Sequence, residues 1–272
     1  MDFPKYETVK VEREGNGVTW VILNRPEKMN AMNPTLNQEM LSVLNVIETD
    51  EETRVMVLTG AGRAYCAGQD IKETFRERDA DRDAHKVSSL GQDWRFDKLY
   101  YLPKPTIAMV NGWTCGGAFT HLFACDFAIA SEDAKLCLSE VNWGIIAGGL
   151  VTKVISTELR YRDALEALLL AEPYSGTRAA EVGFVNYAVP ATELRSATLA
   201  LADKIMTKSE PVYVAQKLAY RAVLGMDWAS AKTYLASEGE RLRIADPSRA
   251  SGMREFLDNK SYKPGLGAFP KS

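Results

Sequence analysis

The stretch from Thr106 to Thr120 constrains the fold more than any other part of the chain, because a strand-like run leads into a glycine turn. The run Thr106–Val110 is apolar and partly β-branched, which is typical of a buried strand. Gly116-Gly117 follows and is typical of a turn that opens a helix. A helix that begins there points unpaired N–H groups and its positive dipole end outward. The stretch therefore predicts a site suited to an anion or an oxyanion.

A lone acid, Glu140, follows in the otherwise apolar segment from Leu138 to Ile145. A carboxylate near an oxyanion site can supply proton chemistry, so the two features together suggest an enolate-forming enzyme. The alternative is that Glu140 is an exposed or salt-bridged acid at the end of a strand, and the pattern alone leaves this open.

The length and charge of the chain exclude several classes of protein. Its 272 residues can bury a large core, as one big domain or one domain with an appendage. The 33 basic and 36 acidic residues leave a net charge of −3, which argues against a nucleic-acid partner. Apolar runs such as Trp143–Val151 are far shorter than the roughly 18 residues of a membrane span. We expect no membrane partner and a cytoplasmic location, because the first residues also lack an apolar signal core.

Cysteine and histidine usage argues against a metal site. The four cysteines, Cys66, Cys115, Cys125 and Cys137, lack the paired short spacing of zinc ligands, and we expect reduced, buried thiols. With two histidines in the chain, a histidine-rich metal site or triad is not expected, and His121 is predicted to be a packed helix residue. The prediction is therefore no metal and no resident cofactor.

The first hundred residues predict a hairpin, a helix and a strand. Apolar residues alternate on both sides of Gly15-Asn16-Gly17, and this indicates two antiparallel strands. Asn33-Pro34 supplies a helix start, and apolar residues recur at helical spacing up to Glu48. The run Arg54–Thr59 predicts a strand, Ala61–Gly68 a loop, and the charge-rich Asp79–Lys98 an exposed or mobile helical segment.

The second half of the chain predicts mixed elements followed by a helical end. The expected strands are Phe127–Ala130, Lys135–Leu138 and Phe184–Val189. The expected helices are Gly149–Thr157, Tyr161–Leu170, Thr192–Thr207, Val212–Leu224, Trp228–Ile244 and Ser248–Leu257. A β-rich body is thus followed by helices.

Three loops that follow strands are candidates for one composite site: Asn24–Ala31, Ala67–Ile71 and Trp113–Thr120. Loops at the ends of strands form the ligand crevice of many α/β proteins. For each loop taken alone, a simple tight turn is an equally good interpretation.

These loops also carry a resemblance to a known family. Six motifs in order match it: Asn24-Arg25-Pro26 with Asn30-Ala31, Cys66 to Ile71, Lys104-Pro105 with Asn111-Gly112, Gly116-Gly117-Ala118, Cys125-Asp126, and Ser139-Glu140. The chain resembles the crotonase (enoyl-CoA hydratase/isomerase) superfamily over nearly its whole length. Within it the chain is most similar to the hydroxycinnamoyl-CoA hydratase-lyases, on the segments Lys104–Trp113, Leu138–Ile145 and Phe256–Leu266.

The resemblance implies an α/β fold, a spiral of ββα units that forms two roughly perpendicular sheets. Residues 1–205 would be the spiral core with the acyl-CoA site, and residues 206–272 a helical trimerisation region and tail. The resemblance therefore implies a homotrimer or a dimer of trimers.

The resemblance also implies that two backbone N–H groups, of Gln69 and Gly117, hold the thioester carbonyl. Coenzyme A would enter as part of the substrate. Its implied contacts are Glu27, Lys28, Met29, Ala31, Ala67, Asp70 and Ile71. Lys28 would be the side chain nearest the phosphates, although a solvated surface lysine is an equal alternative.

Hydratases of this superfamily use two carboxylates, and the first of these positions is Thr120 here. A threonine hydroxyl is no acid or base near neutral pH, so Glu140 is the acid/base that remains. The lyase branch also has a small hydroxyl residue there. The implied reaction is hydration of feruloyl-, caffeoyl- or coumaroyl-CoA, followed by retro-aldol cleavage to an aromatic aldehyde and acetyl-CoA.

The acyl end of the site matches less well. The residues expected to line the acyl pocket are Thr74, Trp113, Thr120, Trp143, Gly144 and Tyr234. Thr74 and Ala236 stand where the lyases have tyrosines. Two alternatives therefore stay open: a hydratase or isomerase acting on another acyl-CoA without cleavage, and a non-catalytic protein that binds acyl-CoA or serves as a scaffold.

Overall fold

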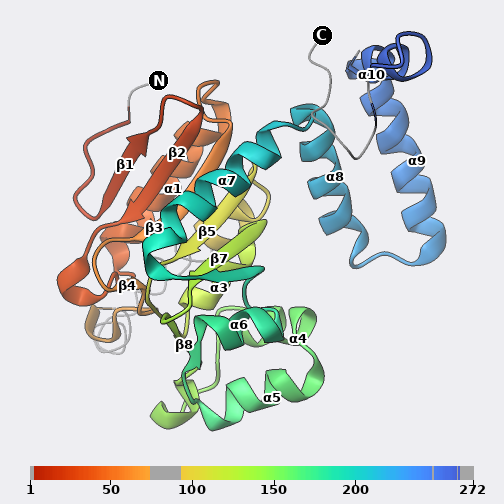
Figure 1. Cartoon of the computed structure of the whole chain (residues 1–272). Helices are drawn as coiled ribbons and strands as arrows, with labels where there is room; N and C mark the ends of the chain where they lie inside the picture. Colours follow the sequence, from red (N-terminus) through yellow and green to blue (C-terminus); the bar gives the residue numbers. More distant parts are fainter. Residues whose placement is uncertain (1–2, 74–92, 247, 262, 264–272) are drawn as a thin grey trace. The chain divides into compact units, whose positions relative to one another are not determined.

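The computed structural model describes residues 3–73, 93–246, 248–261 and 263 (Figure 1). The chain forms two compact units, Met1–Ala200 and Leu201–Ser272. The boundary falls inside helix α7 (Leu194–Met206), and the division expected at residue 205 falls near the end of the same helix.

A six-stranded sheet runs through the first unit (Figure 1). Its order is β1-β2-β3-β5-β7-β10. The β1/β2 pair is antiparallel, and every later pair in the sheet is parallel. The strands are β1 (Val9–Arg13), β2 (Val18–Leu23), β3 (Val55–Gly60), β5 (Thr106–Val110), β7 (Phe127–Ser131) and β10 (Tyr187–Val189).

The predicted hairpin is confirmed, with Val9 opposite Leu23 and Arg13 opposite Thr19. Strand β2 is buried along almost its whole length, including Thr19 and Val21. It pairs with β1 and β3 at its edges, Cζ of Arg195 in α7 lies 4.1 Å from the centroid of the Trp20 ring, and Val21 belongs to the core cluster, so side chains cover both of its faces. A strand inside a covered sheet loses the polar face that alternation would predict. The alternating pattern therefore located β2 correctly but did not indicate that both of its faces are buried.

A second sheet has the order β4-β6-β8-β9. Its strands are β4 (Ala64–Cys66), β6 (Trp113–Cys115), β8 (Lys135–Cys137) and β9 (Tyr174–Ser175). The prediction of a loop over Ala61–Gly68 is wrong for β4, because three residues are too few to show an alternating pattern. The strand at Thr106–Val110 also does not lead directly into a helix: the chain changes sheets at Asn111-Gly112 and forms β6 first.

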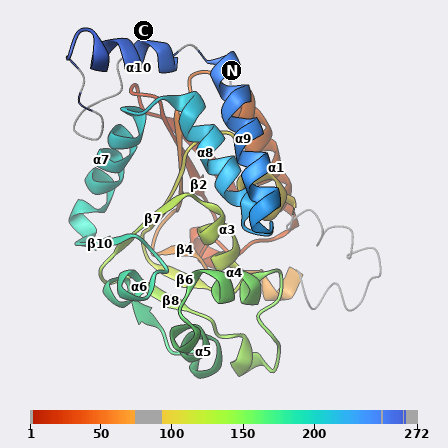
Figure 2. The same ribbon diagram turned by 90° about the vertical axis from the view of Figure 1, so that its right-hand side faces the viewer.

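Helix α1 (Pro34–Thr49) begins as predicted, with the Asn33 side chain accepting a hydrogen bond from Leu36 N at 3.0 Å. Among the described residues, the first unit also contains α3 (Ala118–Ala124), α4 (Val151–Glu158), α5 (Tyr161–Leu170), α6 (Gly176–Val182) and the first part of α7. Figures 1 and 2 show α4, α5 and α6 gathered at the end of the unit that holds β8. Short helical turns lie at Pro26–Lys28 (η1), Glu140–Trp143 (η5) and Ala191–Glu193 (η6).

The segment Asp93–Leu99 forms a π-helix, η4, against α1 and α3. Trp94 is fully buried and donates a hydrogen bond to Asn37 Oδ1 at 2.9 Å, and Leu99 is also fully buried. The helical character predicted up to Lys98 is therefore confirmed, but the predicted exposure is wrong for Trp94 and Arg95, which are buried. Residues 79–92 of that prediction lie outside the described residues.

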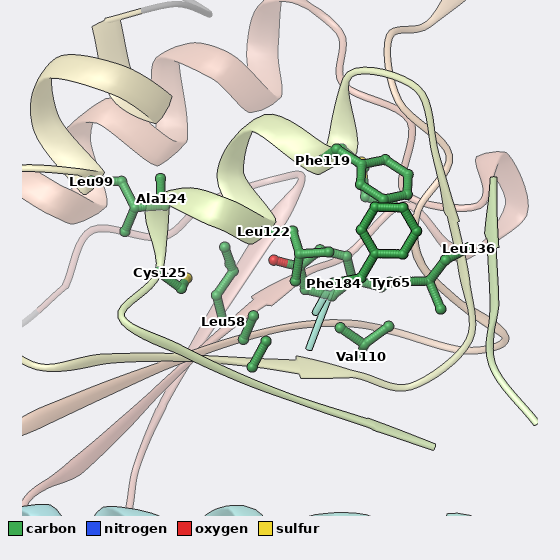
Figure 3. Packing of buried hydrophobic residues seen from close by; sticks show 14 of the residues in the cluster. Leu58, Tyr65, Leu99, Val110, Phe119, Leu122, Ala124, Cys125, Leu136 and Phe184 are labelled. Atoms are coloured by element: carbon green, nitrogen blue, oxygen red, sulfur yellow. The ribbon is translucent and has the colours of Figure 1, made fainter. Parts of the chain in front are cut away.

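The core of the first unit surrounds α3 (Figure 3). The Phe119 ring meets the Phe184 ring edge to face, with their centroids 5.0 Å apart. Other buried members of the cluster come from β3, β4, β5, η4 and β8: Leu58, Tyr65, Val110, Leu99 and Leu136. The buried side chains of α3 therefore pack against residues of both sheets, and the helix is held where the two sheets meet.

The second unit is helical, as predicted. It contains the end of α7, then α8 (Glu210–Val223), α9 (Trp228–Ala245) and α10 (Ser248–Leu257). Asp227 caps α9 by accepting hydrogen bonds from Ala229 N and Ser230 N at 2.9 and 3.0 Å. Among the described helices, none combines the length and the apolar character needed to cross a membrane.

The sheet change at Asn111-Gly112 leads to a stability prediction. A Cβ on Gly112 would lie 2.1 Å from the Arg63 carbonyl oxygen, whereas a Cβ on Gly15 would meet nothing within 4 Å. We expect Gly112→Ala to cost about 1–3 kcal/mol or more because backbone must shift. Gly15→Ala is the matched control. Equal thermal unfolding midpoints for the two variants would contradict this packing.

Candidate active site

The three loops predicted to form one site meet at Gly68. This residue has φ +88°, and a Cβ on it would lie 2.7 Å from the Cys115 carbonyl oxygen and 3.2 Å from Gly117 N. The first loop joins through Met32 N, which donates to Gly68 O at 2.8 Å, and Met32 O, which accepts from Asp70 N at 2.9 Å. Glycine is required at position 68 both for its dihedral angle and for this close approach.

Two backbone N–H groups at this junction are unused. Within the described parts of the chain, neither Gln69 N nor Gly117 N donates a hydrogen bond, although Gly116 N donates to Cys137 O at 3.1 Å. A Cβ on Gly117 would lie 3.5 Å from Cγ of Gln69, so the two residues are adjacent. The helix starts at Ala118, one residue later than expected, with Gly117 as its N-cap. The junction therefore offers a pair of free donors.

Glu140 lies beside the same glycine turn. A Cβ on Gly116, which has φ +51°, would lie 3.2 Å from Oε1 of Glu140. Oε2 is buried and has no hydrogen-bond partner, and burial raises the pKa of Glu140 above its usual 4.5. The alternative of a salt-bridged acid does not hold among the described residues. An acid of this kind is suited to exchanging protons near neutral pH.

The predicted acyl-pocket residues fall in different settings. Thr120 is fully buried on α3, and its hydroxyl donates to Gly149 O at 3.2 Å. Trp113 is half-buried on β6, whereas Trp143 and Gly144 are exposed beside Glu140. Tyr234 lies on α9 in the second unit, and Thr74 lies outside the described residues. Trp113 and Thr120 therefore lie on either side of the glycine turn, and Trp143 and Gly144 lie in the loop after Glu140.

The segment after Glu140 exposes a run of large apolar side chains. Ile146 is 86 % exposed and Trp143 64 % exposed. Three further exposed members are Val141, Ile145 and Leu150. Side chains of this kind suit contact with an apolar acyl group or with another protein surface.

Four of the residues expected to contact coenzyme A, Glu27, Lys28, Met29 and Ala31, lie in one surface turn that the buried Asn30 fixes to the rest of the unit. Glu27 and Lys28 are exposed on η1, and Met29 has a left-handed φ of +50°. Asn30 is fully buried; its side chain accepts from Arg25 N and donates to Ala61 O and Ala64 O, at 2.9, 2.9 and 2.7 Å. Asn30 therefore ties this turn to β4, and Ala31 is buried behind it.

Asp70 is also expected to contact coenzyme A, but its side chain has another partner. Nη1 of buried Arg25 lies 3.2 Å from Oδ2 of Asp70, and Nη2 lies 3.3 Å from Oε1 of Glu73. The carboxylate of Asp70 therefore fixes the loop that carries Gln69. Ala67 is half-buried and Ile71 is exposed on either side of it.

Arg95 is a residue near the site that the sequence did not reveal. It is buried, with Nη1 3.6 Å from the Cβ position of Gly117, and burial lowers its pKa to about 10. The sequence signal was its position between Trp94 and Phe96, two aromatic residues in a charge-rich stretch. The structure places a buried positive charge behind the glycine turn.

His121 is packed in the core, as predicted. Its ring lies 5.3 Å from the Tyr65 ring and 5.2 Å from the Trp94 ring, and burial lowers its pKa well below the usual range. Two tyrosines could offer hydroxyls in place of the lyase tyrosines absent at Thr74 and Ala236: Tyr65, which is fully buried, and Tyr101, which is exposed. Within the described residues, no group of three or more histidine, cysteine or acidic side chains could hold a metal ion.

Comparison with known proteins decides the family. The model of the enoyl-CoA hydratase/isomerase family matches residues 13–263. The chain belongs to this family. It is 44 % identical to the hydroxycinnamoyl-CoA hydratase-lyase of Pseudomonas fluorescens, over 98 % of each chain. It is also 34 % identical to the short-chain-enoyl-CoA hydratase of Clostridium acetobutylicum, over 94 % of this chain and 96 % of that one.

The fold agrees with this assignment. The crystal structure of an enoyl-CoA hydratase from Bacillus anthracis matches with a TM-score of 0.84 at 28 % identity and covers 93 % of this chain and 97 % of its own. The expected α/β fold with two sheets is therefore confirmed, and the chain is a member of an enzyme family.

The burial of Glu140 leads to a pH-dependent stability prediction. Because its pKa is raised in the folded state, ionising it destabilises the fold as the pH rises through that value. We expect Glu140→Gln to raise the Tm by a few degrees at pH 8. The gain should vanish below the ordinary pKa of 4.5, where the acid is neutral in both states.

The exposed Glu132 provides the control for this experiment. Glu132→Gln should leave the Tm unchanged at both pH values. A Glu140→Gln variant that is less stable than wild type at pH 8 would contradict the assignment of Glu140 as a poorly solvated acid.

Proposed function

We propose that this protein hydrates a hydroxycinnamoyl-CoA thioester and cleaves the product to an aromatic aldehyde and acetyl-CoA. The observation that carries the proposal is one half-buried acid, Glu140, beside the glycine turn, while α3 carries Thr120 and no acidic residue. The identity of 44 % with a hydroxycinnamoyl-CoA hydratase-lyase supports it. The substrate is an acyl-CoA, as expected for the family.

In the proposed hydration, Glu140 takes a proton from water as the water oxygen attacks the β-carbon of the aryl-propenoyl thioester. The electron pair moves onto the thioester oxygen, where the N–H groups of Gln69 and Gly117 stabilise the enolate. Glu140 then returns the proton to the α-carbon. The raised pKa of Glu140 suits a group that both accepts and donates a proton.

The proposed cleavage uses the same groups again. Glu140 takes the proton of the new β-hydroxyl, the bond between the α- and β-carbons breaks, and the aldehyde forms. The enolate of acetyl-CoA is held by the same two N–H groups until Glu140 protonates its α-carbon. A para-hydroxyl on the ring would assist by donating electrons toward the β-carbon.

A second candidate is hydration or isomerisation of another acyl-CoA without cleavage. Thr74 and Ala236, at positions where the lyases have tyrosines, favour it. So do relatives such as the (E)-benzylidenesuccinyl-CoA hydratase of Thauera aromatica, 33 % identical over 78 % of this chain and 81 % of that one. A non-catalytic binding or scaffold role is the third candidate.

One assay separates the three candidates. The protein is incubated with feruloyl-CoA and, separately, with crotonyl-CoA, and the products are resolved by chromatography. Vanillin and acetyl-CoA from feruloyl-CoA support the lyase. Hydrated crotonyl-CoA with feruloyl-CoA untouched selects the hydratase, and no product from either overturns the proposed function.

We expect Glu140→Gln to abolish turnover and leave binding of the thioester intact, because the amide has nearly the same shape and no titratable proton. Turnover is measured by aldehyde release and binding by calorimetry with feruloyl-CoA. Exposed Glu132→Gln is the control and should keep full activity. Near-normal turnover by Glu140→Gln would rule out its proposed role.

Gly117 allows its backbone donor to be tested directly. Its φ of −55° is compatible with proline, and a Cβ there meets neighbours at ordinary distances of 3.4 Å or more. We expect Gly117→Pro, which lacks the N–H, to lose about 10²–10³-fold in kcat. Gly117→Ala keeps the N–H and should lose far less. Equal rates for the two folded variants would exclude this donor.

The remaining assignments belong to the same proposal. They are the coenzyme A contacts at Glu27–Ala31 and Ala67–Ile71, the absence of a resident cofactor, the cytoplasmic location, and a homotrimer or dimer of trimers. The exposed apolar side chains after Glu140 are consistent with subunit contact. Sedimentation that gave a monomer at micromolar concentration would contradict the trimer.

A further inference from the structure

Two cysteines meet directly beneath the glycine turn. Cys115 ends β6 and Cys137 ends β8, and the two are register partners in adjacent parallel strands. Their sulfur atoms lie 3.1 Å apart. Two thiols at this distance can be joined with a small movement of the strand ends, because a disulfide brings its sulfurs to about 2.05 Å.

The pair is coupled by the backbone to the atoms of the proposed reaction. Gly116 follows Cys115, and its N–H donates to Cys137 O at 3.1 Å. The same Gly116 has its Cβ position 3.2 Å from Oε1 of Glu140. Any movement that closes the two sulfurs therefore acts on the turn that carries Gly117 N and on the neighbouring carboxylate.

The chemistry of this pair differs from that of the other cysteines. The hydrogen bond from Cys115 lowers the pKa of Cys137, against the opposing effects of burial and of Glu140. Burial raises the pKa of Cys66 to about 12, which makes it a poor nucleophile. Cys115 is partly exposed, whereas Cys137, Cys66 and Cys125 are buried, and the contact with Cys137 together with burial raises the pKa of Cys115. The thiolate is the form that attacks oxidants, so Cys137 is the attacking thiol, and Cys115, whose sulfur lies 3.1 Å away, is placed to react with the oxidised sulfur.

We infer that Cys115 and Cys137 form an oxidation site that takes small peroxides and closes to a disulfide, and that closure lowers the activity of the adjoining site. The thiolate of the pair attacks a peroxide oxygen and breaks the O–O bond, giving a sulfenic acid and, from hydrogen peroxide, a hydroxide that takes up the proton released by the thiol and becomes water. The second thiol attacks that sulfur, the S–S bond forms, and a second water leaves. Two thiols are oxidised and one peroxide is reduced.

The effect on activity rests on the proposed function, whereas the cross-link does not. Displacement of reacting groups by about 1 Å can cost about 10²-fold in rate. The closing sulfurs pull on Cys115 and Cys137, the residues that position Gly116. We expect turnover of the thioester to fall at least about tenfold on oxidation and to recover with a dithiol reductant.

The test treats the reduced full-length protein with hydrogen peroxide, then alkylates it and maps its peptides by mass spectrometry. A peptide pair joined through Cys115 and Cys137, with the loss of two hydrogens, is the expected product. Cys115→Ser and Cys137→Ser should each abolish it, and Cys125→Ala should keep it. Oxidation that leaves both thiols free, or that joins either one to another cysteine, overturns the site.

Activity on feruloyl-CoA and crotonyl-CoA is measured before oxidation, after it, and after reduction. A cross-linked enzyme with unchanged turnover overturns the coupling to the active turn. If the reduced protein turns over neither thioester, the proposed function fails, and coenzyme A binding by calorimetry replaces turnover as the readout. Equal binding by the cross-linked and reduced forms then overturns the coupling.

Discussion

The active site depends on one close approach between two stretches of backbone. The loop after β4 and the turn after β6 meet at Gly68, where a side chain would collide with the Cys115 carbonyl. This contact brings Gln69 N and Gly117 N to the same place and leaves both without internal partners in the described chain. Backbone donors held in this way need no reorganisation when charge develops on a bound oxygen.

Other interactions around the junction serve to hold it. Asn30 joins the first loop to β4 through three hydrogen bonds, and Arg25 holds Asp70 next to Gln69. Helix α3 is anchored at its other side by the aromatic contacts of Phe119. Much of the polar chemistry that the motifs carry is therefore structural, and it keeps two N–H groups and one carboxylate in place.

Two ionisable groups beside the turn, Glu140 and Arg95, are poorly solvated. Burial shifts the pKa of each in the direction that favours its uncharged form. Burial raises the pKa of Glu140 and lowers that of Arg95. For Glu140 the cost in stability fits the proposed reaction, in which a carboxyl with a raised pKa accepts and returns a proton. Ionised Glu140 therefore lowers the free energy of unfolding, a loss of stability that is common at functional sites.

The strong periodic elements could be predicted from the sequence. The hairpin, α1 and the late helices follow from apolar spacing and end signals over many residues, and these local signals persist in the structure. In the second sheet the apolar pattern predicted β8, as Lys135–Leu138, but not β4, β6 or β9, because these strands have two or three residues each and pair with neighbours distant in sequence. The burial within η4 could not be predicted either, since its charges suggested an exposed segment although Trp94 and Arg95 are buried.

The sequence by itself determined the family and predicted the glycine turn and the acid proposed for the reaction, because these are carried by residue types in a fixed order. Only the tertiary structure decided that Gly68 and Gly117 touch, that Glu140 is half-buried without a partner for Oε2, and that Cys115 faces Cys137. Each of these depends on the register of strands in the second sheet. Register is set by pairing between segments far apart in the chain, and strands of two or three residues carry too short a hydrophobic pattern to specify it.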